Sequence, residues 1–366
     1  MQRYEFPGFI DVHVHFRDPG VPEAETTASG LAAADRGGFA AVVTMPNTSP
    51  ACDSPELIRY QLDEAAVSGE ADSRPLLNED FENSSDSRGR DSTAPLLFPS
   101  ACITKGRLGK EVADLEALAD AGAAFFTDDG TYVSDLKVLE EAMRRAYDLN
   151  MVVCQHALSP AFTEAEAIRR DLAVCRETGC RYHVQHISTA KGVELVREAQ
   201  AEGLPVTAEA TPHHLLLVKD DIPADSSSFF HASRFKMAPP LATKEDRAEV
   251  RKAVKDGVLM FATDHAPHPF AKKNLPYAEA ANGIIGLETA VPITWAVMVE
   301  EEGMSVEAWA RAWHDMPAAL IRGLDPKRLR PTVVEVGEER AVDVSSFVSL
   351  SRNCPYDGMR FRAFPC

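Results

Sequence analysis

The 366-residue sequence lacks long hydrophobic runs and any recognisable targeting segment. No stretch approaches the ~18 consecutive apolar residues of a membrane-spanning helix. The first residues, MQRYEFPGFIDVHVH, have neither the basic part nor the apolar part of a secretory signal. We therefore expect a cytoplasmic protein that does not interact with a membrane.

Basic residues are the minority, with 38 Lys and Arg against 56 Asp and Glu and a formal net charge of −18. A nucleic-acid-binding surface needs a basic stripe, and the chain has no run of Lys and Arg dense enough to form one. Nucleic acid is therefore not expected as a partner.

The seven cysteines are odd in number and scattered, and no two of them form a C-x-x-C pair. This spacing indicates neither a disulfide framework nor a zinc site built from thiolates. Buried free thiols are the expected state of such residues in a reducing compartment.

Apolar segments bounded by turn residues alternate with helical patterns through most of the chain. Strands are predicted at Phe9–His15, Phe39–Met45, Leu96–Ile103, Ala123–Thr127, Met151–His156, Tyr182–Ile187, Pro205–Ala208 and Leu259–Thr263. Helices are predicted at Glu23–Asp35, Ser54–Ala66, Gly109–Ala121, Lys137–Asp148, Glu164–Glu177, Ala190–Ala201 and Lys244–Asp256. Eight strands in this alternation match a (β/α)8 TIM barrel. The alternative, an open doubly wound sheet, normally carries a glycine-rich phosphate turn after its first strand, which this sequence lacks.

Two segments depart from this alternation. Residues 68–93 are polar and rich in Ser, Asp, Glu and Arg, and we predict that they form a long mobile loop. The barrel is expected to occupy residues 1–325. Residues 326–366 are a short C-terminal tail in which AVDVSSFVSL (341–350) is the predicted strand-forming part.

The strongest chemical signal is the segment DVHVHFR (11–17), at the end of the first predicted strand. Residues two apart on a strand point to the same side, so His13 and His15 are expected to project together into the barrel mouth. Other predicted strands end in similar residues, namely Asp128, Asp129, His156, His183, His186 and Asp264. Such strand ends converge on one face of a barrel. Nitrogen and oxygen ligands without thiolates suit zinc or a similar divalent ion, and this set is large enough for two ions.

Spacing leaves two choices open within this set. His183 and His186 are three residues apart, so only one is expected to point inward, and His186 is favoured because it lies nearer the strand's carboxyl end. Asp128 and Asp129 are adjacent, and spacing does not separate them. Asp264 is the candidate general acid/base, acting on water that attacks an amide or ester carbonyl.

The constellation resembles the amidohydrolase superfamily and, within it, the bacterial dihydroorotases of pyrimidine biosynthesis. The matching segments are PGFIDVHVHFRDPG (7–20), MPNTSP (45–50), ITKG (103–106), FTDDG (126–130), HVQHIST (183–189), TAEATPHHL (207–215), FATDHAPH (261–268) and GIIGLET (283–289). They cover nearly the whole predicted barrel in the expected order.

The resemblance implies two zinc ions per subunit and assigns a role to each residue of the site. The implied ligands are His13, His15 and Asp264 for one ion, His156 and His186 for the other, and Asp129 as a bridge in place of a carboxylated lysine. The implied substrate contacts are His15, Arg17, Asn47 and His268, with backbone groups near Asn282 and Gly283 for the pyrimidine ring.

The implied reaction interconverts N-carbamoyl-L-aspartate and L-dihydroorotate, with Asp264 as general acid/base. Both compounds are carboxylates, and Arg17 can bind one of them through paired hydrogen bonds. One alternative is a related cyclic amidase that acts on dihydropyrimidine, hydantoin or allantoin rings. Another is a non-catalytic subunit that scaffolds aspartate transcarbamoylase, although such a subunit is expected to have lost metal ligands. A homodimer is also considered.

The sequence departs from the family pattern in two ways. Ala238 and Ala242 stand where many relatives have Asn and Arg. Only eight residues precede the first predicted strand, whereas relatives begin with a longer segment that joins the tail in a small β-domain. A reduced remnant of that domain is therefore expected.

Overall fold

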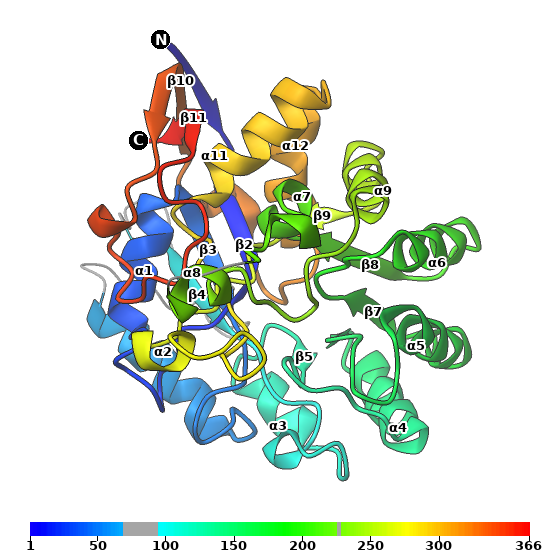
Figure 1. Cartoon of the computed structure of the whole chain (residues 1–366). Helices are drawn as coiled ribbons and strands as arrows, with labels where there is room; N and C mark the ends of the chain where they lie inside the picture. Colours follow the sequence, from blue (N-terminus) through cyan, green and yellow to red (C-terminus); the bar gives the residue numbers. More distant parts are fainter. Residues whose placement is uncertain (69–93, 225–227) are drawn as a thin grey trace.

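The protein is described here by a computed structural model that covers residues 1–68, 94–224 and 228–366. Apart from Ser68, the segment predicted to form a mobile loop lies outside the described residues. A three-stranded and a five-stranded parallel sheet curve around a common axis (Figure 1). Their strands are β2 (Phe9–Val14), β3 (Phe39–Thr44), β4 (Leu96–Pro99), β5 (Phe126–Thr127), β6 (Val152–Gln155), β7 (Arg181–Val184), β8 (Val206–Ala210) and β9 (Met260–Phe261).

Helices surround the parallel strands (Figure 1). They are α1 (Thr27–Arg36), α2 (Pro55–Ser68), α3 (Leu115–Asp120), α4 (Leu136–Asp148), α5 (Glu164–Thr178), α6 (Ala190–Ala201), α7 (Pro212–Leu216), α8 (Phe229–Ser233), α9 (Lys244–Lys255), α10 (Phe270–Lys273), α11 (Ala290–Thr294), α12 (Val306–Trp313) and α13 (Asp315–Ala318). None of those in the described ranges is long and apolar enough to cross a membrane.

Short bridges join the two parallel sheets into one closed barrel. On one side, Ala101 pairs with Phe126 of β5 just beyond the end of β4. On the other, Val14 of β2 pairs with His265, and the backbone N–H of His15 donates to the carbonyl of His265 at 2.9 Å. The predicted (β/α)8 barrel is confirmed, and the open doubly wound sheet is excluded.

Alternation along the strands separates the barrel interior from its helical coat. On β6, Val152 and Cys154 belong to the cluster that fills the barrel, whereas Val153 packs in the larger cluster that includes Leu139 and other helix residues. The same alternation carries His156, two residues beyond Cys154, into the mouth of the barrel.

The boundaries of several predicted elements need correction. The strand predicted at Leu96–Ile103 ends at Pro99, and that predicted at Leu259–Thr263 contains only Met260–Phe261. The helix predicted at Gly109–Ala121 begins at Leu115, where the Asp114 carboxylate caps it by accepting from the N–H of Ala117 at 3.2 Å.

A small antiparallel sheet lies beside the barrel, formed by β1 (Gln2–Phe6), β10 (Thr332–Ala341) and β11 (Arg360–Pro365) in the order β1–β10–β11 (Figure 1). Strand β1 is not among the strands predicted from the sequence, and the predicted tail strand lies at 341–350. That placement is wrong, because only Ala341 of that segment lies in a strand. Whether this sheet is a remnant of a larger domain stays a prediction, as does the division at residue 325.

Helix α12 covers the seam where β9 meets β2. Trp313 is fully buried and packs its ring against Phe9, Phe39 and Phe261, which come from β2, β3 and β9, with ring centroids 6.3, 5.2 and 4.9 Å away. Its indole N–H donates to the hydroxyl of Thr294 at 3.2 Å. One side chain therefore holds three strands of the barrel together.

The substitution Trp313→Ala is expected to lower the free energy of unfolding by about 3–5 kcal/mol, because it opens a cavity under the barrel seam. Urea titration followed by circular dichroism measures the change. The exposed aromatic Tyr147 provides the control, since Tyr147→Ala should change stability by less than about 0.5 kcal/mol. Equal unfolding midpoints for the two variants would contradict this account of the seam.

Candidate metal centre

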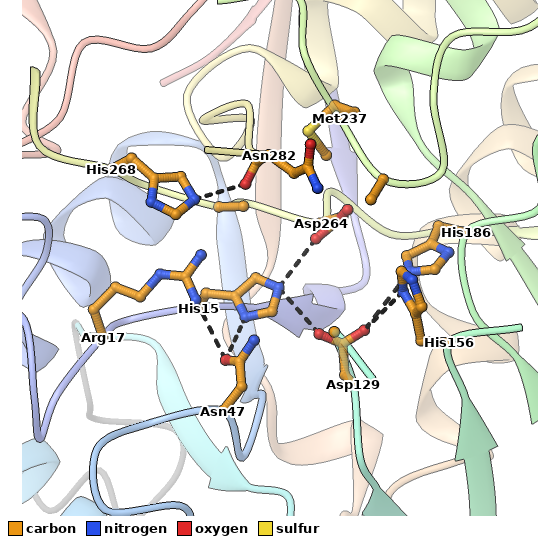
Figure 2. Close-up of a pocket in the computed structure, with 13 residues that line it drawn as sticks. His15, Arg17, Asn47, Asp129, His156, His186, Met237, Asp264, His268 and Asn282 are labelled. Carbon is orange, nitrogen blue, oxygen red and sulfur yellow. Dashed lines mark hydrogen bonds and ion pairs between the residues drawn. The ribbon is translucent and has the colours of Figure 1, made fainter. Parts of the chain in front are cut away.

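The imidazoles and carboxylates predicted from the strand ends gather around one cavity of about 260 Å³ (Figure 2). The predicted site residues that line it are His15, Arg17, Asn47, Asp129, His156, His186, Asp264, His268 and Asn282. His13 is fully buried and contacts the same carboxylates. The barrel therefore brings together residues that are far apart in the sequence.

Asp129 lies between two groups of imidazoles (Figure 2). Its Oδ1 is 3.4 Å from Nε2 of His13, 3.6 Å from Nε2 of His186 and 3.7 Å from Nδ1 of His156. Its Oδ2 is 3.4 Å from Nε2 of His15. This is the position that a bridging carboxylate requires.

Asp128, the alternative to Asp129, points away from these imidazoles. Its carboxylate accepts from the backbone N–H of Thr104 at 3.1 Å and from the hydroxyl of the same residue. Asp128 therefore braces the segment after β4, and Asp129 is the carboxylate that faces the cavity.

Asp264 approaches the cluster from the end of β9. Its Oδ1 is 3.1 Å from Nε2 of His15 and 3.5 Å from Nε2 of His13. Asp264 has a φ of 48°, and Arg17 and His186 also have positive φ values, of 57° and 34°. A left-handed backbone costs a residue with a side chain roughly 1–2 kcal/mol. Five described residues with a side chain have a positive φ, and these three lie just beyond strand ends at the mouth, whereas the other two are Arg107 and Asn150.

The expectation that only one of His183 and His186 faces inward is wrong. Strand β7 ends at Val184, and the positive φ of His186 breaks the strand alternation, so its ring turns toward Asp129. His183 also faces the interior, where its Nε2 lies 2.9 Å from Oε2 of Glu209. His186 borders the cavity, and His183 lies behind it.

Glu209 on β8 is a residue of the cluster that the sequence analysis did not identify. It is buried, and its Oε1 lies 2.5 Å from Nδ1 of His13 and accepts from the backbone N–H of His186 at 3.1 Å. One signal for Glu209 was available in the sequence, namely a carboxylate on a buried strand within TAEATPHHL. Glu209 lies two residues after Thr207, which also faces inward and whose hydroxyl contacts His183. Its contacts connect three histidines.

Hydrogen bonds fix the orientation of the two leading imidazoles. Glu209 accepts the proton on Nδ1 of His13, and the side-chain oxygen of Asn47 accepts that on Nδ1 of His15 at 2.8 Å. In both rings Nε2 then faces the carboxylates of the cluster. An outer carboxylate or amide that orients an imidazole in this way is typical of metal-binding histidines.

The charge balance of the cluster fits divalent cations. Three buried carboxylates, those of Asp129, Asp264 and Glu209, cost free energy unless positive charge offsets them. Burial lowers the pKa of His13, but these carboxylates outweigh burial and raise it well above its usual value. Burial, together with the nearby carboxylates, raises the pKa of Asp264 well above its usual value. A divalent ion supplies the required charge, and its binding releases these protons.

The ligand atoms also fit such ions in position. Nε2 of His13 and Oδ1 of Asp129 are buried and have no hydrogen-bond partner among the described residues. Three groups have ligand atoms within 4.8 Å of one another, namely His13–His15–Asp129, Asp129–His156–His186 and His13–His186–Asp264. Asp129 is shared by the first two groups, so the residues are able to hold two ions side by side.

The opposite wall of the cavity carries the groups predicted to bind substrate. Arg17 donates through Nε to the carbonyl of Pro267 at 3.2 Å and through Nη1 to Asn47 at 3.4 Å. Nε2 of His268 donates to the carbonyl of Asn282 at 2.6 Å. Burial, with help from Arg17, lowers the pKa of His268 to about 3, so its ring is neutral. Gly283 is buried next to Asn282 and packs closely against the ring of His268.

The sequence matches the amidohydrolase family over residues 4–313. A dihydroorotase of Anoxybacillus flavithermus is 36% identical over 98% of this chain and 84% of the relative. A dihydroorotase of Listeria innocua is 35% identical over 96% of this chain and 82% of the relative.

Solved structures with the same fold include an L-hydantoinase (dihydropyrimidinase) from Arthrobacter aurescens, with a TM-score of 0.79 and 22% identity over 99% of this chain and 83% of that chain. A D-hydantoinase (dihydropyrimidinase) from Thermus sp. has a TM-score of 0.80 and 19% identity over 99% of this chain and 82% of that chain. At these identities, the likeness concerns the fold alone.

The substitution Glu209→Gln is expected to weaken metal binding about 10–100-fold, because the amide loses the charge that orients His13. Metal retained during dialysis against chelators of graded strength measures the change. Asp171→Asn is the matched control, since Asp171 is an equally buried carboxylate that bonds Tyr132 and Tyr182 outside the cluster. Unchanged retention in Glu209→Gln would show that this carboxylate does not support the metal ligands.

Proposed function

The chain belongs to the amidohydrolase family and is a hydrolase of cyclic amides, and from that premise we propose that it is a zinc-dependent dihydroorotase of pyrimidine biosynthesis. The proposed reaction interconverts N-carbamoyl-L-aspartate and L-dihydroorotate. The proposed metal ligands are His13, His15, Asp129, His156, His186 and Asp264, for two ions per subunit. The proposed substrate contacts are His15, Arg17, Asn47, His268, Asn282 and Gly283.

Arg17 is the observation that carries the choice of substrate. Its guanidinium lines the cavity, and it forms no ion pair within the described part of the chain. Burial lowers the pKa of Arg17 to about 10, so the group stays positively charged at neutral pH. A carboxylate on the substrate satisfies this charge through paired hydrogen bonds, whereas a hydantoin or dihydropyrimidine ring without one leaves it unpaired.

The proposed chemistry assigns separate tasks to the two sides of the cavity. Bound metal ions supply Lewis-acid polarisation of the amide carbonyl and activation of the attacking water. Asp264 accepts the proton of that water and delivers it to the departing ring nitrogen. In the direction of ring closure, Asp264 removes a proton from the ureido nitrogen as that nitrogen bonds the carboxyl carbon, and it delivers the proton to the carboxyl oxygen that leaves as water. Arg17 and Asn47 hold the substrate carboxylate during both steps.

Two alternatives from the sequence have less support. The solved hydantoinase structures share the fold, but nothing in the cavity favours an uncharged ring over a carboxylate that pairs with Arg17. The non-catalytic scaffold has no support from the six candidate ligands, which are all retained and gathered at one site. A homodimer, an association with aspartate transcarbamoylase and the cytoplasmic location stay predictions.

The substitution Arg17→Ala is expected to lower kcat/KM for dihydroorotate by on the order of 100-fold or more, because a charge-assisted pair with the substrate is lost. Arg17→Lys keeps the charge but loses the paired hydrogen-bond geometry, so its kcat/KM should lie between the values of the wild type and of Arg17→Ala. Arg144→Ala, on the exposed side of α4, is the control. If the wild-type enzyme turns over hydantoin or dihydrouracil faster than dihydroorotate, the proposed substrate is wrong.

The substitution Asp264→Ala is expected to lower kcat by about 10²–10⁴-fold at saturating zinc, the usual contribution of a general acid/base. Steady-state kinetics in both directions, with zinc measured in the same samples, provide the test. Asp256→Ala, which removes an exposed carboxylate at the end of α9, should leave kcat unchanged. Residual activity above roughly a tenth of wild type would remove Asp264 from its proposed role.

A further inference from the structure

We propose that Asn353 and Lys273 are positioning residues that hold the substrate-binding wall formed by His268, Asn282 and Gly283. The inference rests on the proposed function for the identity of the wall. Asn353 belongs to the C-terminal tail, so in this proposal the tail helps to form the substrate pocket.

Asn353 connects two loops at the barrel mouth, although it follows β10 near the end of the chain. Its side chain is fully buried. Its Oδ1 accepts from the backbone N–H of His268 at 3.2 Å, and its Nδ2 donates to the carbonyls of Ala266 and Gly283 at 2.9 and 3.0 Å. The backbone carbonyl of Asn353 accepts from the N–H of Ile285 at 3.2 Å. One residue thus links the loop after β9 to the loop around Gly283.

Lys273 of α10 also forms hydrogen bonds to the backbone of the substrate-binding wall. It is fully buried, and none of the described carboxylates forms an ion pair with it. Its Nζ donates to the carbonyls of Gly283, Ala281 and Lys236 at 2.9, 3.0 and 3.3 Å. A lysine without a buried counter-ion is costly, so this arrangement indicates a specific task, which is to gather three carbonyls at one point.

The two side chains share the carbonyl of Gly283 as an acceptor, and the N–H of Gly283 donates to the carbonyl of Lys236 at 2.9 Å. Its position leaves little freedom, because an added Cβ would lie 2.4 Å from the carbonyl oxygen of Ala266 and 2.5 Å from Cδ2 of His268. The peptide at Gly283 is therefore fixed on both sides. Asn282, immediately before it, accepts the proton on Nε2 of His268.

Loss of Asn353 or Lys273 is expected to affect substrate binding and not the metal centre. Asn353 and Lys273 have no hydrogen bond to any candidate metal ligand in the described structure, whereas both bond the loops that carry the substrate contacts. Their loss should loosen the wall without altering the metal centre. The expected signature is a higher KM with little change in kcat or in metal content.

The experiment compares Asn353→Ala and Lys273→Met in the full-length, zinc-loaded protein with Lys272→Met, which alters the exposed neighbour on α10. Hydrogen exchange followed by mass spectrometry reports on the wall without any substrate. We expect faster exchange in peptides that cover 266–268 and 281–285, and unchanged exchange elsewhere. We also expect KM to rise by on the order of 10-fold while kcat stays within about threefold.

Asn353 and Lys273 both bond the carbonyl of Gly283. The effect of the double variant on KM should therefore differ from the sum of the two single effects, expressed as free energies. Unchanged exchange in the wall peptides, exchange that rises throughout the barrel, or a parallel loss of zinc would overturn the inference. If Asn353→Ala does not fold, Asn353→Ser keeps a donor and an acceptor and should give a smaller change of the same kind. Faster local exchange in an enzyme that does not act on dihydroorotate would support the positioning role and reject the proposed substrate.

Discussion

The closure of the barrel between β2 and β9 is the constraint on which the site depends. The buried carboxylate of Asp11 accepts from the backbone N–H groups of His13 and Thr263 at 3.1 and 3.0 Å, so one side chain fixes the register of two segments 252 residues apart. His13 and His15 follow directly on one side of this seam, and Asp264 follows on the other. Trp313 covers the same seam from outside. Stability and site geometry therefore have a common origin, because the contacts that close the barrel also set the distances between imidazoles and carboxylates.

Charge is distributed unevenly between the surface and the cavity. The chain carries a net charge of −18, yet its proposed substrate is an anion. Salt screens the acidic exterior over about 8–10 Å, so long-range attraction is not what recruits the substrate. In the proposed function, recognition comes from groups inside the cavity, namely Arg17 and the cations that the carboxylate cluster is able to hold. Burial makes these local interactions stronger than the same charges would be at the surface.

The sequence was sufficient to predict the barrel and most of the cluster, because strand alternation and strand ends are local properties. His13, His15, His156 and Asp264 follow from them directly. The inward orientation of both His183 and His186 was not predictable, since it depends on a positive φ at a histidine, which side-chain type does not signal. The strand β1 was missed because its partner β10 lies more than 320 residues away and their pairing has no local pattern. Asn353 was missed for the same reason, since its contacts are long-range.

The small sheet and Asn353 also impose an order on biosynthesis. The strand β1 leaves the ribosome long before its partners, residues 332–336, and Asn353 follows these partners in the sequence. Much of the barrel can fold during translation, since domains fold as their segments emerge. The wall around Gly283, however, can be completed only when Asn353 has left the ribosome. A nascent chain, or one terminated before Asn353, can therefore possess the candidate metal ligands while it lacks a finished pocket.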